Sequence, residues 1–257
     1  FPLPFFTTLA ILFCPISAQS GTPYFLHDVS PLFSRLKCNM AMCHGKAEGQ
    51  NGFRLSVFGF NPEEDYRTLI NESRGRRLSF GAPENSLLLR KATGEIGHGG
   101  GVPLTKGTRE YRLFRDWIAA GAPYSTGERP PLAKLRIEPE RKLLGFGAKQ
   151  PLRVWAEYAD GSRRDVTWQA VFHANNPGMA KVTPSGQVNI EHSIGQASVM
   201  ARYQGEVAVF QAFIPRPGAK GSFPRRPVHN FIDKLVDAHL QRLNVHPSGI
   251  TDEATFL

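Results

Sequence analysis

The sequence predicts a multidomain chain in which a mainly α region is followed by an all-β sandwich and then by a truncated helical segment. Three observations lead to this expectation. Apolar side chains recur at helical spacing near residue 114, short runs of alternating side chains fill 133–215, and two stretches rich in Pro and Gly separate the regions. We therefore expect domains at 24–124, 133–215 and 228–257, joined by linkers at 125–132 and 216–227.

The composition is that of a globular chain with many loops. Hydrophobic residues make up 41% of the 257 residues and charged residues 21%, with 20 prolines and 25 glycines. The net charge is +9, but the basic residues are spread in short groups such as Arg76 with Arg77 and Arg225 with Arg226. Such pairs are typical of solvated loops, so we expect no nucleic acid partner, whereas a basic surface would suit an acidic redox protein.

Residues 1–19, "FPLPFFTTLAILFCPISAQ", form an apolar run too short to span a bilayer comfortably, and it ends near the small pair Ser17 and Ala18. We interpret it as a signal peptide truncated at its start, with a buried strand or a membrane anchor as the alternative. The mature chain is then exported, periplasmic or at the cell surface, without a membrane span. Removal of Cys14 would leave two cysteines in an oxidising compartment.

Helix signals mark both ends of the region 24–124. The stretch "DVSPLFSRL" predicts a helical turn that leads into Cys38, and "TREYRLFRDWIAAGAP" predicts a strong helix that Gly121 and Pro123 end. We expect Tyr111 and Trp117 to pack inside this region rather than to carry electrons. A domain with so few periodic helices needs something else at its centre, such as a cofactor.

Strand signals begin after the first linker. In "PLRVWAEYADGSRRDVT" the side chains of Leu152, Val154, Ala156 and Tyr158 alternate inward before a turn at 160–161. Turns at 185–186 and 204–205 divide two further strand pairs. About seven short strands at this spacing predict a β-sandwich over 133–215. Beyond the second linker, 228–257 has apolar side chains at helical spacing followed by a second helix start, which we interpret as the first fragment of a further domain.

The stretch "CNMAMCHGK", residues 38–46, contains two cysteines and a histidine, which are potential metal or haem ligands. Two thiols followed directly by an imidazole predict covalent haem, with Cys38 and Cys43 forming thioethers and His44 placed under the iron. The usual gap between the cysteines is two residues, whereas here it is four. A zinc site would have to use adjacent Cys43 and His44 on one ion, and a disulfide between the cysteines is the third alternative.

A haem iron also needs a ligand on its opposite face. His98 lies in "GEIGHGGGVPL", where small residues would allow the backbone to approach a flat ring. Met40 and Met42 are too near His44 to reach that face, and His27 is a weaker candidate. We therefore predict His98 as the distal ligand, which would fill both axial positions and favour electron transfer over activation of a bound molecule.

Three stretches, "CNMAMCHGKAEGQNGFRLSVFGFNPEEDYRTLINESRGRR", "SLLLRKATGEIGHGGG" and "YRLFRDWIAAGAP", resemble the N-terminal c-type cytochrome region of large exported planctomycete proteins. The segment with "YADGSRRDVT" and "GQASVMARYQG" resembles the group 2 bacterial Ig-like domain that commonly follows it. The last segment resembles the start of an uncharacterised planctomycete domain. The family shares the four-residue gap and the "HGGG" loop, so the resemblance implies haem c on Cys38, Cys43, His44 and His98.

The leading hypothesis is an exported c-type cytochrome module that binds one covalent haem for electron transfer with an unknown redox partner protein. An Ig-like domain would join it to a larger region outside this sequence. The rival is a cell-surface adhesion or carbohydrate-binding protein with a structural disulfide, in which Trp155 and Trp168 could form a sugar platform, although core packing explains them better. No hydrolase motif is recognisable in the sequence, so an enzymatic activity stays uncertain.

Overall fold

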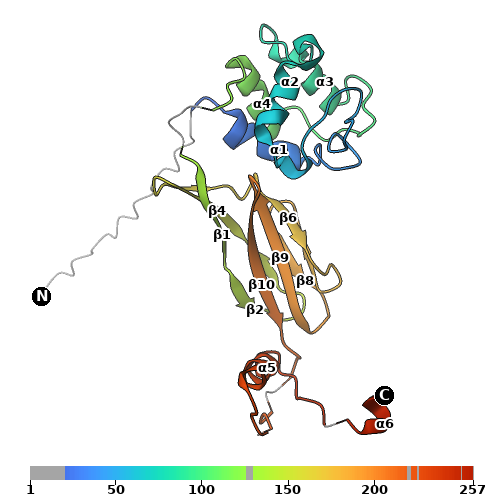
Figure 1. Cartoon of the computed structure of the whole chain (residues 1–257), viewed down its shortest axis with the longest axis vertical. Helices are drawn as coiled ribbons and strands as arrows, with labels where there is room; N and C mark the ends of the chain where they lie inside the picture. The colour runs from blue at the N-terminus through green and yellow to red at the C-terminus, as the bar shows by residue number, and fades with distance from the viewer. Residues whose placement is uncertain (1–20, 126–129, 219–220, 225, 250, 257) are drawn as a thin grey trace, which may run out of the picture.

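The computed structural model describes residues 21–125, 130–218, 221–224, 226–249 and 251–256. The predicted signal peptide and parts of both predicted linkers lie outside these residues. A helical N-terminal part is followed by a β-rich part, and two further helices lie beyond the far end of the strands (Figure 1). No helix in the described ranges is both long enough and apolar enough to cross a membrane.

The predicted mainly α class is wrong. Helices account for about 27% of the chain and strands for about 23%, so the architecture is mixed. The reason lies in the stretches between the N-terminal helices, where glycines at positive φ, such as Gly49, Gly52 and Gly101, hold turns that interrupt helical hydrogen bonding. The N-terminal part is therefore a set of short helices connected by long turns.

The helices of the N-terminal part enclose one apolar core. Its elements are the π-helical turn η1 (Phe25–Val29), α1 (Ser30–Arg35), the 3-10 turn η2 (Val57–Gly59), α2 (Pro62–Ile70), the 3-10 turns η3 (Glu72–Gly75) and η4 (Pro83–Asn85), α3 (Leu87–Ala92) and α4 (Arg109–Ala119). Phe25, Leu32, Leu69 and Trp117 are fully buried at its centre. Their burial is the main stabilising contribution of this part.

Helix α4 follows from its sequence. The Thr108 hydroxyl caps it by accepting the Tyr111 N–H at 3.3 Å, and Gly121, at φ 85°, ends it in the left-handed conformation. Its apolar face is buried, as the spacing predicts, and consists of Tyr111, Phe114, Trp117 and Ile118. The Trp117 indole N–H donates to the Pro123 carbonyl at 3.1 Å, so the polar atom of the largest core side chain is satisfied.

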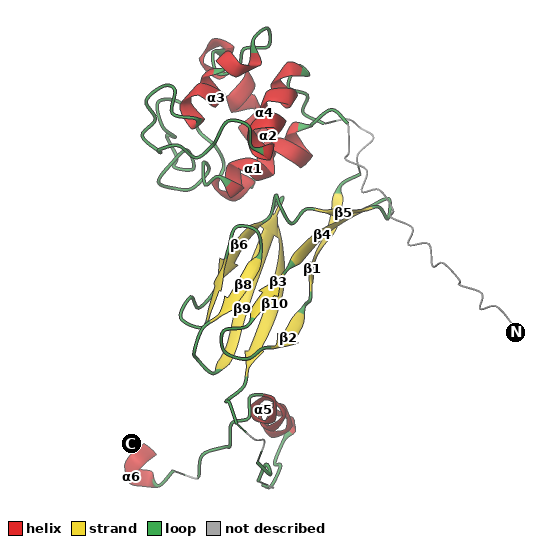
Figure 2. Cartoon of the chain, turned by 180° about the vertical axis from the view of Figure 1, so that it is seen from behind, coloured by secondary structure: helices red, strands yellow, loops and turns green. Residues whose placement is uncertain are grey.

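The β-rich part contains three sheets around one core, rather than the two sheets of the predicted Ig-like sandwich. Its strands are β1 (Leu132–Glu138), β2 (Arg141–Leu143), β3 (Lys149–Pro151), β4 (Arg153–Tyr158), β5 (Arg163–Asp165), β6 (Val171–Ala174), β7 (Ala180–Val182), β8 (Gln187–Ile190), β9 (Gly195–Tyr203) and β10 (Glu206–Ile214). The sheet orders are β1-β4-β5, β2-β10-β9-β6 and β3-β8-β7. Figure 2 shows the strands running between the helical part and α5. The third sheet arises because β7 and β8 pair with short β3.

The long hairpin of β9 and β10 organises the core of the β-rich part. Its antiparallel register runs from Tyr203 opposite Glu206 to Gly195 opposite Ile214, and β2 pairs with β10 in parallel. Val199, Phe210 and Val154 are fully buried, because alternate side chains of each strand point into one core. Of the predicted inward residues, Leu152, Val154 and Ala156 are buried, while Tyr158 is partly buried.

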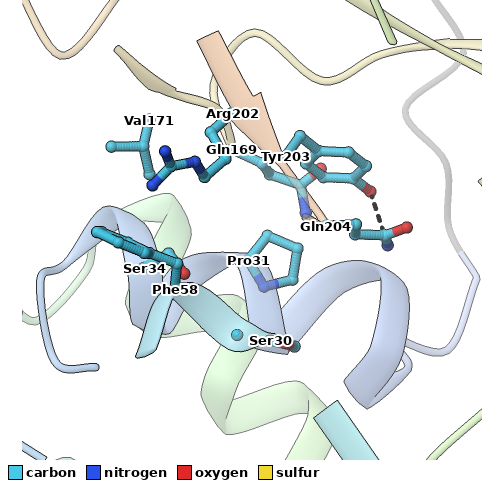
Figure 3. A pocket seen from close by; sticks show the side chains of 10 residues that line it. Ser30, Pro31, Ser34, Phe58, Gln169, Val171, Arg202, Tyr203 and Gln204 are labelled. Atoms are coloured by element: carbon cyan, nitrogen blue, oxygen red, sulfur yellow. Dashed lines mark hydrogen bonds between the residues drawn. The ribbon is translucent and has the colours of Figure 1, made fainter. Parts of the chain in front are cut away.

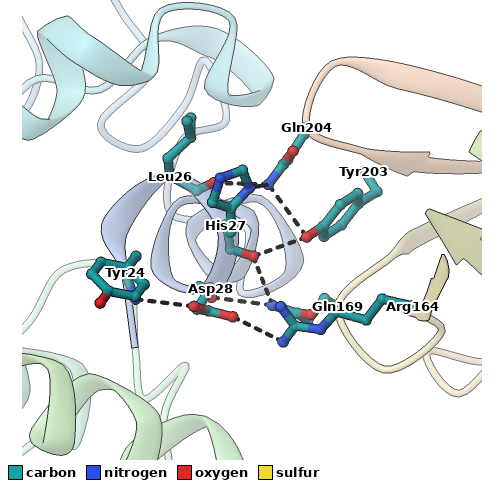
Figure 4. A network of polar contacts seen from close by, with 8 residues as sticks. All are labelled: Tyr24, Leu26, His27, Asp28, Arg164, Gln169, Tyr203 and Gln204. Atoms are coloured by element: carbon teal, nitrogen blue, oxygen red, sulfur yellow. Dashed lines mark hydrogen bonds and ion pairs between the residues drawn. The ribbon is translucent and has the colours of Figure 1, made fainter. Parts of the chain in front are cut away.

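The two parts are in direct contact through η1. The Tyr203 hydroxyl donates to the His27 carbonyl at 2.9 Å, and the Gln204 amide donates to the Leu26 carbonyl at 2.9 Å (Figure 4). The Arg164 guanidinium pairs with the buried Asp28 carboxylate at 2.8 Å. A cavity of about 10 Å³, room for one water molecule, lies beside this network between Pro31 and the strand ends (Figure 3).

The C-terminal helices are α5 (Phe231–Arg242) and α6 (Glu253–Phe256). Asn230 and Asp233 form a capping box at the start of α5, and its apolar side chains, such as Phe231 and Leu235, are exposed. The Arg242 guanidinium lies over the Phe213 ring at 4.5 Å, which joins the helix to the end of β10.

Candidate functional site

The cysteines and His44 lie on a loop that begins directly after α1. Cys38 N–H donates to the Phe33 carbonyl at 2.8 Å, and His44 N–H donates back to the Cys38 carbonyl at 3.0 Å. The four residues between the cysteines therefore form a closed turn in which the first cysteine and the histidine are hydrogen-bonded. A Cβ on Gly45 would lie 2.3 Å from the Asn39 carbonyl oxygen, so the position after His44 requires glycine.

The His44 ring is oriented by one backbone carbonyl. Its Nδ1 lies 2.9 Å from the Phe53 carbonyl oxygen, and because a carbonyl can only accept, Nδ1 carries the proton and Nε2 is left as the basic nitrogen. The Phe53 ring lies against it with 4.6 Å between ring centres. Burial lowers the pKa of His44 from its ordinary value. The hydrogen bond to the Phe53 carbonyl opposes this shift, and the charges of His98 and Arg77 add to it. The imidazole is therefore neutral and suited to bind a metal.

His98 is held in the same way on the glycine-rich loop before α4. Its Nδ1 donates to the Gly101 carbonyl at 2.9 Å, and Gly101, at φ 76°, gives the turn that brings this carbonyl back to the ring. A Cβ on Gly100 would lie 3.0 Å from Cε1 of His98, so the loop follows the ring closely. Two of the glycines predicted to admit a flat ring, Gly100 and Gly101, thus lie against the imidazole itself.

The structure brings the two predicted iron ligands together. The ring centres of His44 and His98 are 6.3 Å apart, and the ring planes differ by 11°. Two imidazoles on opposite sides of one metal ion would be separated by about 6 Å, from about 2 Å for each metal–nitrogen bond and about 1 Å from each nitrogen to its ring centre. Because both Nδ1 atoms are engaged, both Nε2 atoms are the available ligands. The distance between the ring centres therefore matches that of two histidines that could hold one metal ion.

Cys38 and Cys43 are both free thiols and half-buried. Burial, followed by the neighbouring Cys43, raises the pKa of Cys38 to about 12, and its thiol donates weakly to the Leu36 carbonyl at 3.8 Å. In the described part of the chain, no three His, Cys, Asp or Glu side chains come together as a metal cluster.

The weaker sequence candidates lie elsewhere. His27 is buried in the contact between the two parts, where its Nδ1 lies 3.1 Å from the Gln204 amide nitrogen. Trp155 lies under the Arg163 guanidinium at 4.1 Å, and Trp168 lies under that of Arg109 at 3.8 Å. Each tryptophan is therefore covered by a different arginine, which does not favour a shared sugar platform.

Sequence reasoning missed two residues of the site. Phe53 contributes through its backbone carbonyl, which has no residue-specific signal in a sequence. Arg77 was interpreted as one of a group of solvated basic residues, yet it is only 5% exposed and its guanidinium lies over the Phe53 ring at 4.9 Å. Its place in "RGRR" gave no indication that one arginine of the group points inward.

Comparison of the chain with protein-family models gives no match, and comparison with curated proteins gives none either. The resemblance to planctomycete cytochrome proteins therefore stays a prediction, and the argument for function depends on the geometry above.

Proposed function

We propose that the N-terminal part binds one haem c and transfers electrons. The observation that carries the proposal is the His44 and His98 pair, with ring centres 6.3 Å apart and each Nδ1 hydrogen-bonded to a backbone carbonyl. Cys38 and Cys43 would hold the haem through thioether bonds, and the two Nε2 atoms would be the axial ligands. When bound, the haem supplies an iron centre that changes its charge by one electron.

The residues of the chain would hold this centre in one geometry. The Phe53 and Gly101 carbonyls fix the orientation of the two imidazoles and increase their basicity, which strengthens them as ligands. The turn of 38–44 keeps the thiols next to His44 on the same loop. If His44 and His98 both hold the iron, they would leave no ligand position for a substrate, so electron transfer is the favoured function rather than an oxygenase or peroxidase reaction.

The proposal extends to location and partner. The apolar segment 1–19 supports export, so we place the mature chain in the periplasm or at the cell surface. The net charge of +9 favours an acidic redox protein as the partner, because complementary charge accelerates encounter. We expect no nucleic acid partner, since the basic residues are dispersed along the chain.

Expression with a functional export signal, in a host that attaches haem c, tests this function. We expect the purified chain to gain the mass of one haem and to keep it through acid-acetone extraction, with the pyridine haemochrome spectrum of haem c. The double variant Cys38→Ser/Cys43→Ser should lose all extraction-resistant haem. Met40→Leu, in the same loop but exposed, should keep it and serves as the matched control. A colourless wild-type chain under these conditions would refute the proposal.

A further inference from the structure

Arg77 is a buried cation whose hydrogen bonds join three segments near His44. Its Nη1 donates to the Thr68 carbonyl at 2.6 Å and to the Glu72 carbonyl at 3.0 Å, and its Nη2 donates to the Gly52 carbonyl at 2.5 Å. None of these acceptors is a carboxylate. Burial lowers the pKa of the guanidinium from its usual value, with Glu72 opposing, but arginine remains charged at neutral pH.

The contacts of Arg77 lead to His44 by two routes through Phe53. The first route is the backbone, because Gly52, whose carbonyl Arg77 holds, immediately precedes Phe53, whose carbonyl accepts the His44 Nδ1–H at 2.9 Å. The second route is the ring, since the guanidinium lies 4.9 Å from the centre of the Phe53 ring, which itself lies 4.6 Å from that of His44. Arg77 therefore contacts both the backbone before Phe53 and the Phe53 ring, and Phe53 orients the imidazole.

We propose that Arg77 is a positioning residue for the His44 ligand and, through its positive charge, a determinant of the reduction potential of the bound haem. The inference rests on the proposed function. A cation near the iron disfavours the ferric state, which carries one more positive charge than the ferrous state. The planar fork of the guanidinium is needed for the simultaneous bonds, so lysine would keep the charge but not the full set of hydrogen bonds.

Three variants of the full chain test the inference. Arg77→Met removes the fork and the charge, Arg77→Lys removes only the fork, and Arg76→Met removes one charge from the exposed neighbouring position as the matched control. In the haem-free protein, the ring ¹⁵N shifts of His44 report which nitrogen carries the proton. We expect the Met and Lys variants to lose the Nδ1–H preference and Arg76→Met to retain it.

In the haem-loaded protein, the electron paramagnetic resonance signal of the ferric iron reports the orientation of the imidazole planes. We expect a changed signal in both Arg77 variants and a lower midpoint potential in Arg77→Met than in Arg77→Lys. Unchanged ¹⁵N shifts and an unchanged electron paramagnetic resonance signal, with only a loss of thermal stability, would show that Arg77 only stabilises the fold and would overturn the inference.

If Arg77→Met does not fold, the comparison of Arg77→Lys with the wild type decides. A wild-type chain that binds no haem refutes the proposed function, while the ¹⁵N measurement still tests the positioning of His44.

Discussion

At the scale of single residues, two backbone carbonyls determine how the histidines are presented. The Phe53 and Gly101 carbonyls accept the Nδ1 protons of His44 and His98, so both rings keep the same tautomer and expose the same nitrogen. Glycine is required where the backbone of a loop packs against an earlier part of the same loop, as at Gly45, where a Cβ would collide with the Asn39 carbonyl. The loops that carry His44 and His98 thus determine both their own backbone conformation and the orientation of the two imidazole rings.

A second residue near the site has a pH-dependent role in stability. Asp65 is 3% exposed and accepts hydrogen bonds from the Ser56 backbone N–H and from the Ser56 hydroxyl, the latter at 2.7 Å. Burial raises the pKa of Asp65 above its ordinary value of 3.8, and the Ser56 bonds only partly oppose the shift. Because the folded-state pKa is raised, the neutral carboxyl stabilises the fold below the unfolded pKa, and this contribution is lost as the pH rises through the folded pKa.

We expect Asp65→Asn, which stays neutral, to lose this dependence. In urea unfolding of the haem-free chain from about pH 3 to about pH 7, the stability of the wild type relative to Asp65→Asn should fall as the pH rises. Glu63→Gln, at an exposed position of the same helix turn, is the matched control. A stability difference between the wild type and Asp65→Asn that is flat across this range would show that burial does not raise this pKa.

At the scale of elements, the helices and turns that depend on residues close together in the chain could be predicted from the sequence. Helix α4, its buried face and its end at Gly121 follow from spacing and turn residues, and so do the turns of the β4–β5, β7–β8 and β9–β10 pairs. The mainly α class was wrong because loops between capped helices have no periodic signal by which their length could be judged. The third sheet was missed because β3 is only three residues long, and its pairing with β8 depends on tertiary contact.

In the candidate site too, the local features could be predicted from the sequence and the features that depend on tertiary packing could not. Cys38, Cys43 and His44 are adjacent in sequence and could be recognised there, and His98 was selected for its glycine-rich loop. Their approach to 6.3 Å between ring centres is a property of the tertiary fold. The contributions of the Phe53 carbonyl and of buried Arg77 could not be predicted, because a carbonyl acceptor and the burial of one arginine among three depend on distant packing.

At the scale of the whole molecule, the β-rich part is in direct contact with the helical part rather than separated from it. The contact includes the ion pair of Asp28 and Arg164, whose side chains are 5% and 20% exposed, and the hydrogen bonds of Tyr203 and Gln204 to the backbone of η1 (Figure 4). The same η1 contributes Phe25 to the helical core. The two parts should therefore unfold together, since loss of the contact disturbs the core.

Replacement of Arg164 tests this coupling. Arg164→Met removes the ion pair with the buried Asp28 carboxylate and should destabilise the chain more than the loss of a surface pair, which contributes about 0 to 1 kcal/mol. Arg163→Met is the matched control, because Arg163 pairs with Glu138, which is 52% exposed. We expect chemical denaturation to show one transition for the wild type and for Arg163→Met, and two separated transitions for Arg164→Met. Equal stability losses in the two variants would contradict a structural role of the contact.

The central claim is that His44 and His98 are the two axial ligands of one haem iron. The most direct test is the absorption spectrum of haem-loaded His98→Ala, with and without carbon monoxide, beside His192→Ala, an exposed histidine of the β-rich part, as the control. We expect the wild type and His192→Ala to show a low-spin spectrum that carbon monoxide does not readily change. His98→Ala should become high-spin in the absence of carbon monoxide and should bind it. A low-spin spectrum in His98→Ala, unchanged by carbon monoxide, would contradict the claim.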